Sequence, residues 1–279
     1  MKHHILRMRN HPDSPLDFGD TKTWTWAEDC FEPCEHVPLS DRGFRYGMSV
    51  FESVRISNGE PEFWDRHLAR LRGACAEREF AVADRALEAA GQLLECEKSV
   101  AWARVYVTAG DGQPTAAVEA PRVFVIIEGR APATDESYEI TICEEEYRAP
   151  FRGLKTANYW FNIEARAGAR KLGFDEALLF NGFAELVSAS MANVFVVREN
   201  EILTPHRSSG ARTGVIREWV MGRRKVQERR LRREDVVQAD EIFLTSSWLG
   251  VMPVATVEGR PLGHRVIGPK LAAELENRR

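Results

Sequence analysis

Lysine is scarce in this sequence. The 279 residues carry 38 basic side chains, of which only seven are lysines, so arginine is the usual positive charge of the chain. An arginine cannot form an imine with an aldehyde, whereas a lysine can. Lys155 stands at the entry to the most strongly patterned stretch of the chain, residues 154–197, and is therefore a candidate for covalent chemistry.

Long apolar runs and a large excess of one charge are also missing. No apolar run approaches the length of a membrane span, and residues 1–10 lack the apolar core of a secretion signal. A net charge of −4 gives no reason to expect a nucleic acid or an anionic membrane as a partner. We therefore expect a cytoplasmic globular protein that binds neither nucleic acid nor membrane.

Cysteine occurs five times, an odd number without a repeated spacing. This usage is typical of reduced thiols in a reducing compartment. Cys30, Cys34 and His36 could ligate zinc, but no second ligand pair has the spacing of a metal site. We expect no metal site.

The central stretch predicts a strand, a helix and a hairpin. After an extended entry, small residues predict a helix over Tyr159–Leu172, ended by Gly173 where a left-handed cap costs least. Two apolar runs follow, at Glu176–Phe180 and Phe183–Val187. Asn181-Gly182 separates them, a dipeptide that permits the positive φ angles of a tight turn.

Elsewhere the pattern predicts a two-domain α/β (α+β) protein. Apolar periodicity favours helices from His67 to about Glu79 and from Arg85 to about Glu97, before two strands within residues 100–127. The polar segment Gly129–Glu139 is the best linker candidate, so we expect domains at residues 1–130 and 131–279, with residues 1–20 as a mobile arm. The basic segment Gly222–Glu234 is interpreted as a solvated helix face rather than a nucleic-acid site.

Three segments carry a resemblance to a known family. Lys155-Thr-Ala-Asn-Tyr159 and the motifs that follow it, through Asp175-Glu-Ala-Leu-Leu179 to Ala192-Asn-Val-Phe195, resemble the class IV aminotransferases. So do Asp41–Arg55, with its Asp-Arg-Gly and Phe-Glu motifs, and Asp240–Val254. These pyridoxal-phosphate enzymes include branched-chain and D-amino-acid aminotransferases and aminodeoxychorismate lyase. The similarity extends from about residue 24 onward.

The resemblance implies fold type IV, with a smaller N-terminal α/β domain, a larger C-terminal domain and a pocket between them. It implies that Lys155 forms an imine with pyridoxal 5'-phosphate and then acts as the base. Amino acid and 2-oxo acid substrates and a homodimer follow from the same resemblance. The other cofactor-binding positions it indicates are Arg70, Tyr159, Ser188, Val215, Ile216 and Ser247. The substrate-binding positions are Tyr46, Phe51, Arg104 and Trp248.

Three departures keep alternatives open. Ser188 stands where the family usually has a glutamate that binds the pyridine nitrogen, and Glu185 would need a β-bulge to replace it. Ile216 removes a threonine hydroxyl, and Ala109 stands where D-amino-acid enzymes and the lyase commonly have an arginine. An aminotransferase is the main prediction. A lyase of the aminodeoxychorismate type and a non-catalytic relative are the alternatives.

Overall fold

The computed structural model describes residues 21–129, 136–148, 151, 153–263 and 265–278. The chain divides into two compact units. Unit 1 comprises Met1–Pro132 and Lys155–Ala157, and unit 2 comprises Ala133–Leu154 and Asn158–Arg279. The expected mobile arm and the expected domain boundary at residues 130 and 131 lie outside the described residues.

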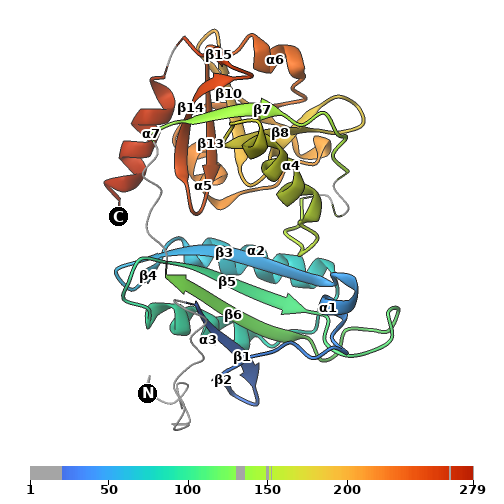
Figure 1. The fold of residues 1–279 in the computed structure, drawn as a ribbon. Coiled ribbons are helices and arrows are strands. Elements are labelled where there is room, and N and C mark those ends of the chain that lie inside the picture. The colour runs from blue at the N-terminus through green and yellow to red at the C-terminus, as the bar shows by residue number, and fades with distance from the viewer. Residues whose placement is uncertain (1–20, 130–135, 149–150, 152, 264, 279) are drawn as a thin grey trace. The chain divides into compact units, whose positions relative to one another are not determined.

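Unit 1 is built on an antiparallel six-stranded sheet with the order β2-β1-β6-β5-β3-β4 (Figure 1). The strands are β1 (Thr21–Ala27), β2 (Cys30–Pro33), β3 (Ser49–Ser57), β4 (Glu60–Pro61), β5 (Ala101–Thr108) and β6 (Arg122–Gly129). Asn58 and Gly59 join β3 to β4 with φ angles of 54° and 78°, the left-handed values that the sequence predicts. The following strand ends at Pro61, and a helix begins at Trp64.

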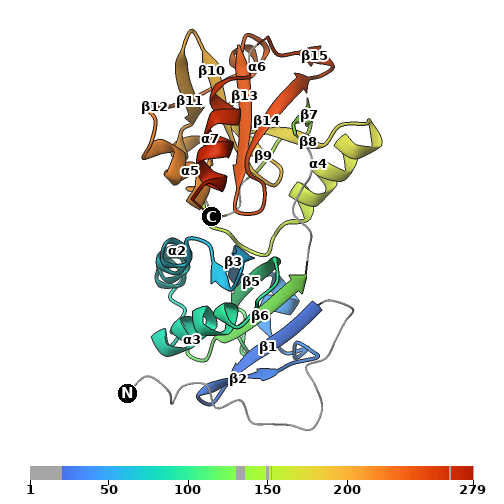
Figure 2. The same cartoon turned by 90° about the vertical axis from the view of Figure 1, so that its left-hand side faces the viewer.

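Two helices cover one face of this sheet, as Figure 2 shows: α2 (Trp64–Glu77) and α3 (Asp84–Glu95). Their apolar residues recur every three or four positions, and Leu71, Leu87 and Leu94 are 0–1% exposed. Each buried leucine contributes about 2 kcal/mol of hydrophobic stabilisation. A short helix, α1 (Arg42–Tyr46), precedes β3, so Tyr46 lies at the end of a helix, whereas Phe51 lies on the strand.

Unit 2 contains a nine-stranded mixed sheet with the order β12-β11-β10-β13-β14-β7-β8-β9, and β15 pairs with β14. The strands are β7 (Tyr138–Ile142), β8 (Glu176–Phe180), β9 (Leu186–Ala189), β10 (Asn193–Arg198), β11 (Glu201–Pro205), β12 (Val226–Arg229), β13 (Glu241–Ser246), β14 (Gly250–Val257) and β15 (Arg260–Pro261). The sheet curls, because β9 also approaches β10 and β11. Its interior holds the main apolar core of the unit.

The helices of unit 2 are α4 (Trp160–Lys171), α5 (Val215–Met221), α6 (Arg233–Val237) and α7 (Ile267–Glu276), with a 3-10 turn at Arg207–Ser209. Helix α4 packs on β8, and α7 packs on β13 and β14. The prediction for α4 is confirmed to within a residue, including Gly173 at φ 89°. None of the helices in the described ranges is long and apolar enough to cross a membrane.

Two local predictions in unit 2 are wrong. The hairpin between β8 and β9 is not a two-residue Asn-Gly turn: Ala184, rather than Gly182, has a positive φ, and β9 begins at Leu186. The Asn181 side chain builds this longer turn, because its Oδ1 accepts from the N–H groups of Phe183 and Glu185 at 2.9 and 3.0 Å.

The basic segment of residues 222–234 is not a helix either. It forms β12 and the start of α6, and its arginines pair with acids from elsewhere in the chain. Arg224 contacts Glu274, Arg229 lies 3.2 Å from Glu201, and Arg233 lies 3.2 Å from Glu258. The excess of positive charge is therefore balanced within the unit.

Candidate active site

Lys155 belongs to unit 1 because residues 155–157 add to the edge of its sheet. The Phe51 N–H donates to the Lys155 carbonyl at 2.9 Å, the Ala157 N–H donates to Ser49 at 3.3 Å, and Thr156 bridges Val50. The Lys155 Nζ lies 4.2 Å from the centroid of the Phe51 ring, a cation–π distance. Phe51 in turn stacks on Tyr106 at 4.8 Å. The amine of Lys155 is therefore fixed on an aromatic surface.

The residue after Phe51 in the chain organises a buried charged cluster. Both oxygens of the Glu52 carboxylate accept from Arg70 of α2, at 2.7 Å from Nε and 2.5 Å from Nη2. The His67 Nδ1, one helical turn earlier, lies 2.7 Å from Glu52 Oε2. The side chains of Glu52 and His67 are 2% and 1% exposed. Charged groups this deeply buried require partners of this kind.

The electrostatics of this cluster fix its protonation state. Burial acts to raise the pKa of Glu52, but the charge of Arg70 and the hydrogen bonds from His67 and Arg70 outweigh it and lower the pKa to about 2. Burial lowers the pKa of His67, and the positive charges of Arg70 and Lys155 add to the effect against the opposing pull of Glu52. Glu52 is therefore anionic and His67 neutral at pH 7, so Arg70 keeps its orientation through a full charge.

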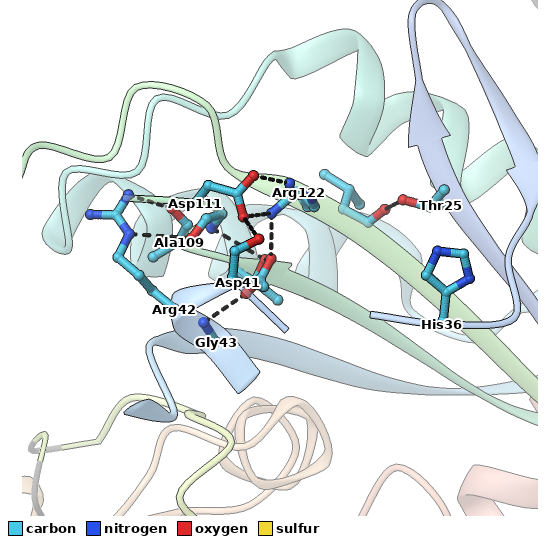
Figure 3. A network of polar contacts seen from close by, with 12 residues as sticks. Thr25, His36, Asp41, Arg42, Gly43, Ala109, Asp111 and Arg122 are labelled. Atoms are coloured by element: carbon cyan, nitrogen blue, oxygen red, sulfur yellow. Dashed lines mark hydrogen bonds and ion pairs between the residues drawn. The ribbon is translucent and has the colours of Figure 1, made fainter. Parts of the chain in front are cut away.

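A second polar network in unit 1 anchors the loop between β5 and β6 (Figure 3). The Asp41 carboxylate caps α1 at the Gly43 N–H and lies 2.9 Å from Arg122, which also pairs with Asp111. Arg42, 1% exposed, donates to carbonyls within residues 109–117, including Ala109 at 2.5 Å and Ala116 at 2.9 Å. The N–H donors of Arg42 therefore all bind the loop and hold it in place.

Arg104 and Tyr46, the other substrate-binding positions predicted in unit 1, differ in their surroundings. The β3–β5 register pairs Arg104 with Ser53 and Phe51 with Tyr106, so Arg104 shares the sheet face of Phe51. Its guanidinium lies 2.9 Å from Glu128 and 4.5 Å from the Trp102 ring centroid. Tyr46 is 44% exposed at the end of α1.

In unit 2, Tyr159 lies at the N-terminal cap of α4 and is bound by an arginine. Arg212 Nη1 donates to the Tyr159 hydroxyl, and the Arg212 guanidinium carbon lies 5.1 Å from the Tyr159 ring centroid. Tyr147 is a second hydrogen-bonding partner of Arg212, and its ring packs in a tilted arrangement against Phe161, with the ring centroids 5.4 Å apart. Tyr159 follows Lys155 by four residues, so the two Cα atoms are at most about 14 Å apart.

Ser188 lies on β9 opposite Leu179, next to a β-bulge at Val187. Within the described residues its hydroxyl makes no hydrogen bond. The bulge that Glu185 would need is therefore present, yet the Glu185 carboxylate is committed elsewhere. It accepts from Ser209 Oγ at 2.7 Å and from Asn181 at 3.4 Å, and the Ser209 hydrogen bond is the main cause of its lowered pKa.

The turn before α5 is tightly built. Asn193 Nδ2 donates to the Arg212 carbonyl at 2.8 Å, and a Cβ at Gly214 would meet Asn193 Oδ1 at 2.0 Å. Only glycine fits there, so no side chain caps the N–H groups of Val215 and Ile216 in the first turn of α5. Ser247 and Trp248 lie in the turn between β13 and β14.

The predicted residues are divided between the two units. Lys155, Phe51, Arg70, Arg104 and Tyr46 belong to unit 1. Unit 2 carries the other six positions, namely Tyr159, Ser188, Val215, Ile216, Ser247 and Trp248. No three residues of the metal-binding types gather at a possible ion site in the described ranges.

Sequence reasoning missed four polar residues that shape these groups: Glu52, His67, Asn193 and Arg212. One signal was available for Glu52, a lone acid within the apolar β3 pattern. The partners of the other three come from distant parts of the chain, which no local spacing reveals.

Comparison with known proteins identifies relatives over most of the chain. Residues 49–257 match the profile of the family described as amino-transferase class IV. The aminodeoxychorismate lyase of Vibrio harveyi is 25% identical over 241 residues, which cover 81% of this chain and 89% of the lyase. The D-alanine aminotransferase of Listeria innocua is 25% identical over 263 residues, 86% of this chain and 89% of that enzyme.

Solved structures share the fold. The branched-chain amino acid aminotransferase of Escherichia coli superposes with a TM-score of 0.79 at 20% identity and covers 91% of this chain and 93% of its own. The branched-chain aminotransferase of Thermoproteus uzoniensis gives a TM-score of 0.80 at 22% identity, with the same coverage of both chains. The fold type IV expected from the sequence is thereby confirmed, and the chain belongs to the class IV aminotransferases, a family of pyridoxal-phosphate enzymes.

Proposed function

We propose that this protein is a pyridoxal-phosphate-dependent aminotransferase that acts on an amino acid and a 2-oxo acid, with Lys155 as its catalytic residue. The proposal rests on the position of the Lys155 amine. Its Nζ lies 4.2 Å from the centroid of the Phe51 ring, and its charge acts on His67 of the Glu52–Arg70–His67 cluster. A lysine used only as a surface charge needs neither feature.

The residues of both units fit the cofactor. Arg70 supplies a planar guanidinium, oriented by Glu52, for a phosphate. The uncapped N–H groups of Val215 and Ile216 supply further donors, because Gly214 keeps side chains out of the turn. Ser247 adds a hydroxyl, Tyr159 a phenol for the ring oxygen, and Ser188 a hydroxyl for the ring nitrogen.

Pyridoxal phosphate supplies an aldehyde for a covalent bond to an amine and a ring that takes up negative charge. The protein supplies the acid–base chemistry. The Lys155 amine, once displaced by the amino group of a substrate, would accept the proton from the substrate α-carbon and pass it to the former aldehyde carbon of the cofactor, so that the 2-oxo acid leaves without it. Phe51, Arg104, Tyr46 and Trp248 are proposed to contact the substrate.

Ser188 favours a second candidate, a carbon–heteroatom lyase. A serine offers the ring nitrogen only a neutral hydrogen bond, whereas a carboxylate would hold a proton on it. Glu185 does not supply that carboxylate, because it is bound to Ser209. The ring is then a weaker acceptor of charge, which slows transamination more than elimination.

Borohydride reduction tests the proposal. Protein incubated with pyridoxal phosphate is reduced and digested, and the peptide that contains Lys155 should carry the reduced cofactor. Lys155→Arg should abolish the label, and Lys171→Arg, at an exposed lysine of α4, should keep it. An unlabelled position 155 in wild-type protein would refute both enzymatic candidates.

Substrate tests then separate the two reactions. D- and L-amino acids should convert the cofactor to its amine form and release a 2-oxo acid if the protein is an aminotransferase. Release of pyruvate without the amine form of the cofactor would support the lyase. We also propose a homodimer, which size-exclusion chromatography with light scattering tests; a monomeric mass would contradict it.

A further inference from the structure

Arg212 differs from the other arginines that the structure buries or half-buries near the candidate site. Arg70 pairs with Glu52, Arg104 with Glu128, and Arg122 with Asp41. Arg212 is bound by the phenol of Tyr159 and by that of Tyr147, and within the described part of the chain no carboxylate pairs with it. It is thus a cation held by neutral groups.

A guanidinium has five N–H donors in a planar fork that matches a carboxylate. Two phenol oxygens use only part of this fork. Burial acts against the charge of Arg212, and attraction to Tyr159 and Tyr147 offsets it, so that the pKa of the guanidinium is raised and the charge is kept. A half-buried charge without a counter-ion loses part of its hydration, and an anionic ligand would recover part of that free energy.

The backbone of Arg212 is fixed, so the guanidinium is presented at a defined place. Asn193 Nδ2 and the Gly214 N–H both donate to the Arg212 carbonyl, at 2.8 and 3.0 Å. The side chain ends at Tyr159, and the chain itself limits the distance from Tyr159 to Lys155 to about 14 Å between Cα atoms. The guanidinium of Arg212 is therefore held at a fixed place within unit 2.

From these observations we infer that Arg212 binds a carboxylate of the substrate and makes this protein selective for substrates that carry one. The inference rests on the proposed function and adds a residue to which no role was given. It is also consistent with Ala109, which stands where related enzymes commonly have an arginine.

The test uses unreactive probes, so that it does not require turnover. Glutarate and its neutral analogue glutaramide have nearly the same size and differ in charge. Their dissociation constants are measured by calorimetry on the full-length protein without cofactor. Wild type should bind glutarate at least about tenfold more tightly than glutaramide, the usual advantage of a charge-assisted pair.

Three variants complete the design. Arg212→Met, of similar length without charge, should abolish the preference for glutarate, and Arg212→Lys should keep part of it because the charge remains but the fork is lost. Arg223→Met is the matched control: Arg223 also lies over an aromatic ring, 4.2 Å from the Trp219 centroid, and should leave the preference unchanged. Thermal unfolding of each variant verifies that it folds.

Two outcomes would overturn the inference. One is that Arg212→Met binds glutarate as wild type does; the other is that it loses affinity for inorganic phosphate and pyridoxal phosphate while glutarate binding stays unchanged. The second result would assign Arg212 to the cofactor. A separate experiment tests the proposed function: if it is wrong, borohydride leaves Lys155 unlabelled. That result does not affect the glutarate measurements.

Discussion

Arg70 binds Glu52 through two hydrogen bonds, of 2.7 Å from Nε and 2.5 Å from Nη2, on a carboxylate that is 2% exposed. The pair joins β3 to α2 inside unit 1. It also fixes the direction in which Arg70 presents its guanidinium. We therefore predict that stability and cofactor affinity depend on the same carboxylate.

Glu52→Gln should destabilise the protein by about 2 kcal/mol, because it leaves Arg70 without a buried counter-charge. Urea denaturation measures this loss. The same variant should bind pyridoxal phosphate more weakly, since Arg70 is no longer held. Glu88→Gln, which breaks the exposed pair with Arg72, should change stability by less than about 1 kcal/mol. Equal effects of the two substitutions would contradict the role given to Glu52.

The same cluster predicts how stability depends on pH. The pKa of His67 is lowered in the folded state from 6.5, so below about pH 6.5 the unfolded chain binds a proton that the folded chain does not, and stability falls as pH falls. The pKa of Glu52 is lowered from 4.5 to about 2, so its contribution is present above pH 4.5 and is lost from there toward pH 2.

His67→Asn should reduce the loss of stability between about pH 6.5 and 5, because the group that titrates only in the unfolded chain is gone. An asparagine can still donate to Glu52. His36→Asn, at an exposed histidine of unit 1, should leave the pH dependence as it is in wild type. Denaturation midpoints at a series of pH values provide the measurement, and an unchanged slope in His67→Asn would count against the prediction.

Arg42→Lys should open the loop between β5 and β6. A lysine ammonium has three donors at one point and cannot reach the carbonyls of Ala109, Gln113 and Ala116 together. Limited proteolysis should then cleave within residues 109–121 at least about tenfold faster. Arg45→Lys, at an exposed position of the same helix, is the control and should behave as wild type.

Ser188→Glu should accelerate the conversion of the cofactor to its amine form by amino acids, since a carboxylate would keep the ring nitrogen protonated. Stopped-flow absorbance follows this half-reaction, and we expect a gain of about tenfold or more. Ser208→Glu, at an exposed serine of the same unit, controls for the added charge. Slower or equal conversion in Ser188→Glu would show that the nitrogen is not what limits the reaction.

Local sequence signals predicted much of the secondary structure. Gly173 and the Asn58-Gly59 pair have the left-handed backbone that their sequence positions indicate, because few residues tolerate it. Asn181-Gly182 misled, since the Asn181 side chain competes for backbone donors and builds a wider turn. The basic segment misled because its counter-charges, such as Glu201 and Glu274, lie far away in the sequence.

For the candidate site too, some residues could be predicted from the sequence and others could not. Lys155 and Arg70 follow from a family motif, and their catalytic and phosphate-binding roles stay predictions. The cluster of Glu52 and His67 that orients Arg70 could not be predicted, because it depends on the packing of α2 on β3. Arg212 required the folded loop before α5, because nothing in its immediate sequence points to Tyr159.

The segment Lys155–Ala157 is counted with unit 1, although the residues on both sides of it are counted with unit 2. The polypeptide therefore crosses from one unit to the other three times instead of once. A fragment that stops after Pro132 would lack the segment that pairs with Ser49–Phe51 of β3. Neither unit is therefore encoded by one uninterrupted stretch of gene that could be exchanged between proteins.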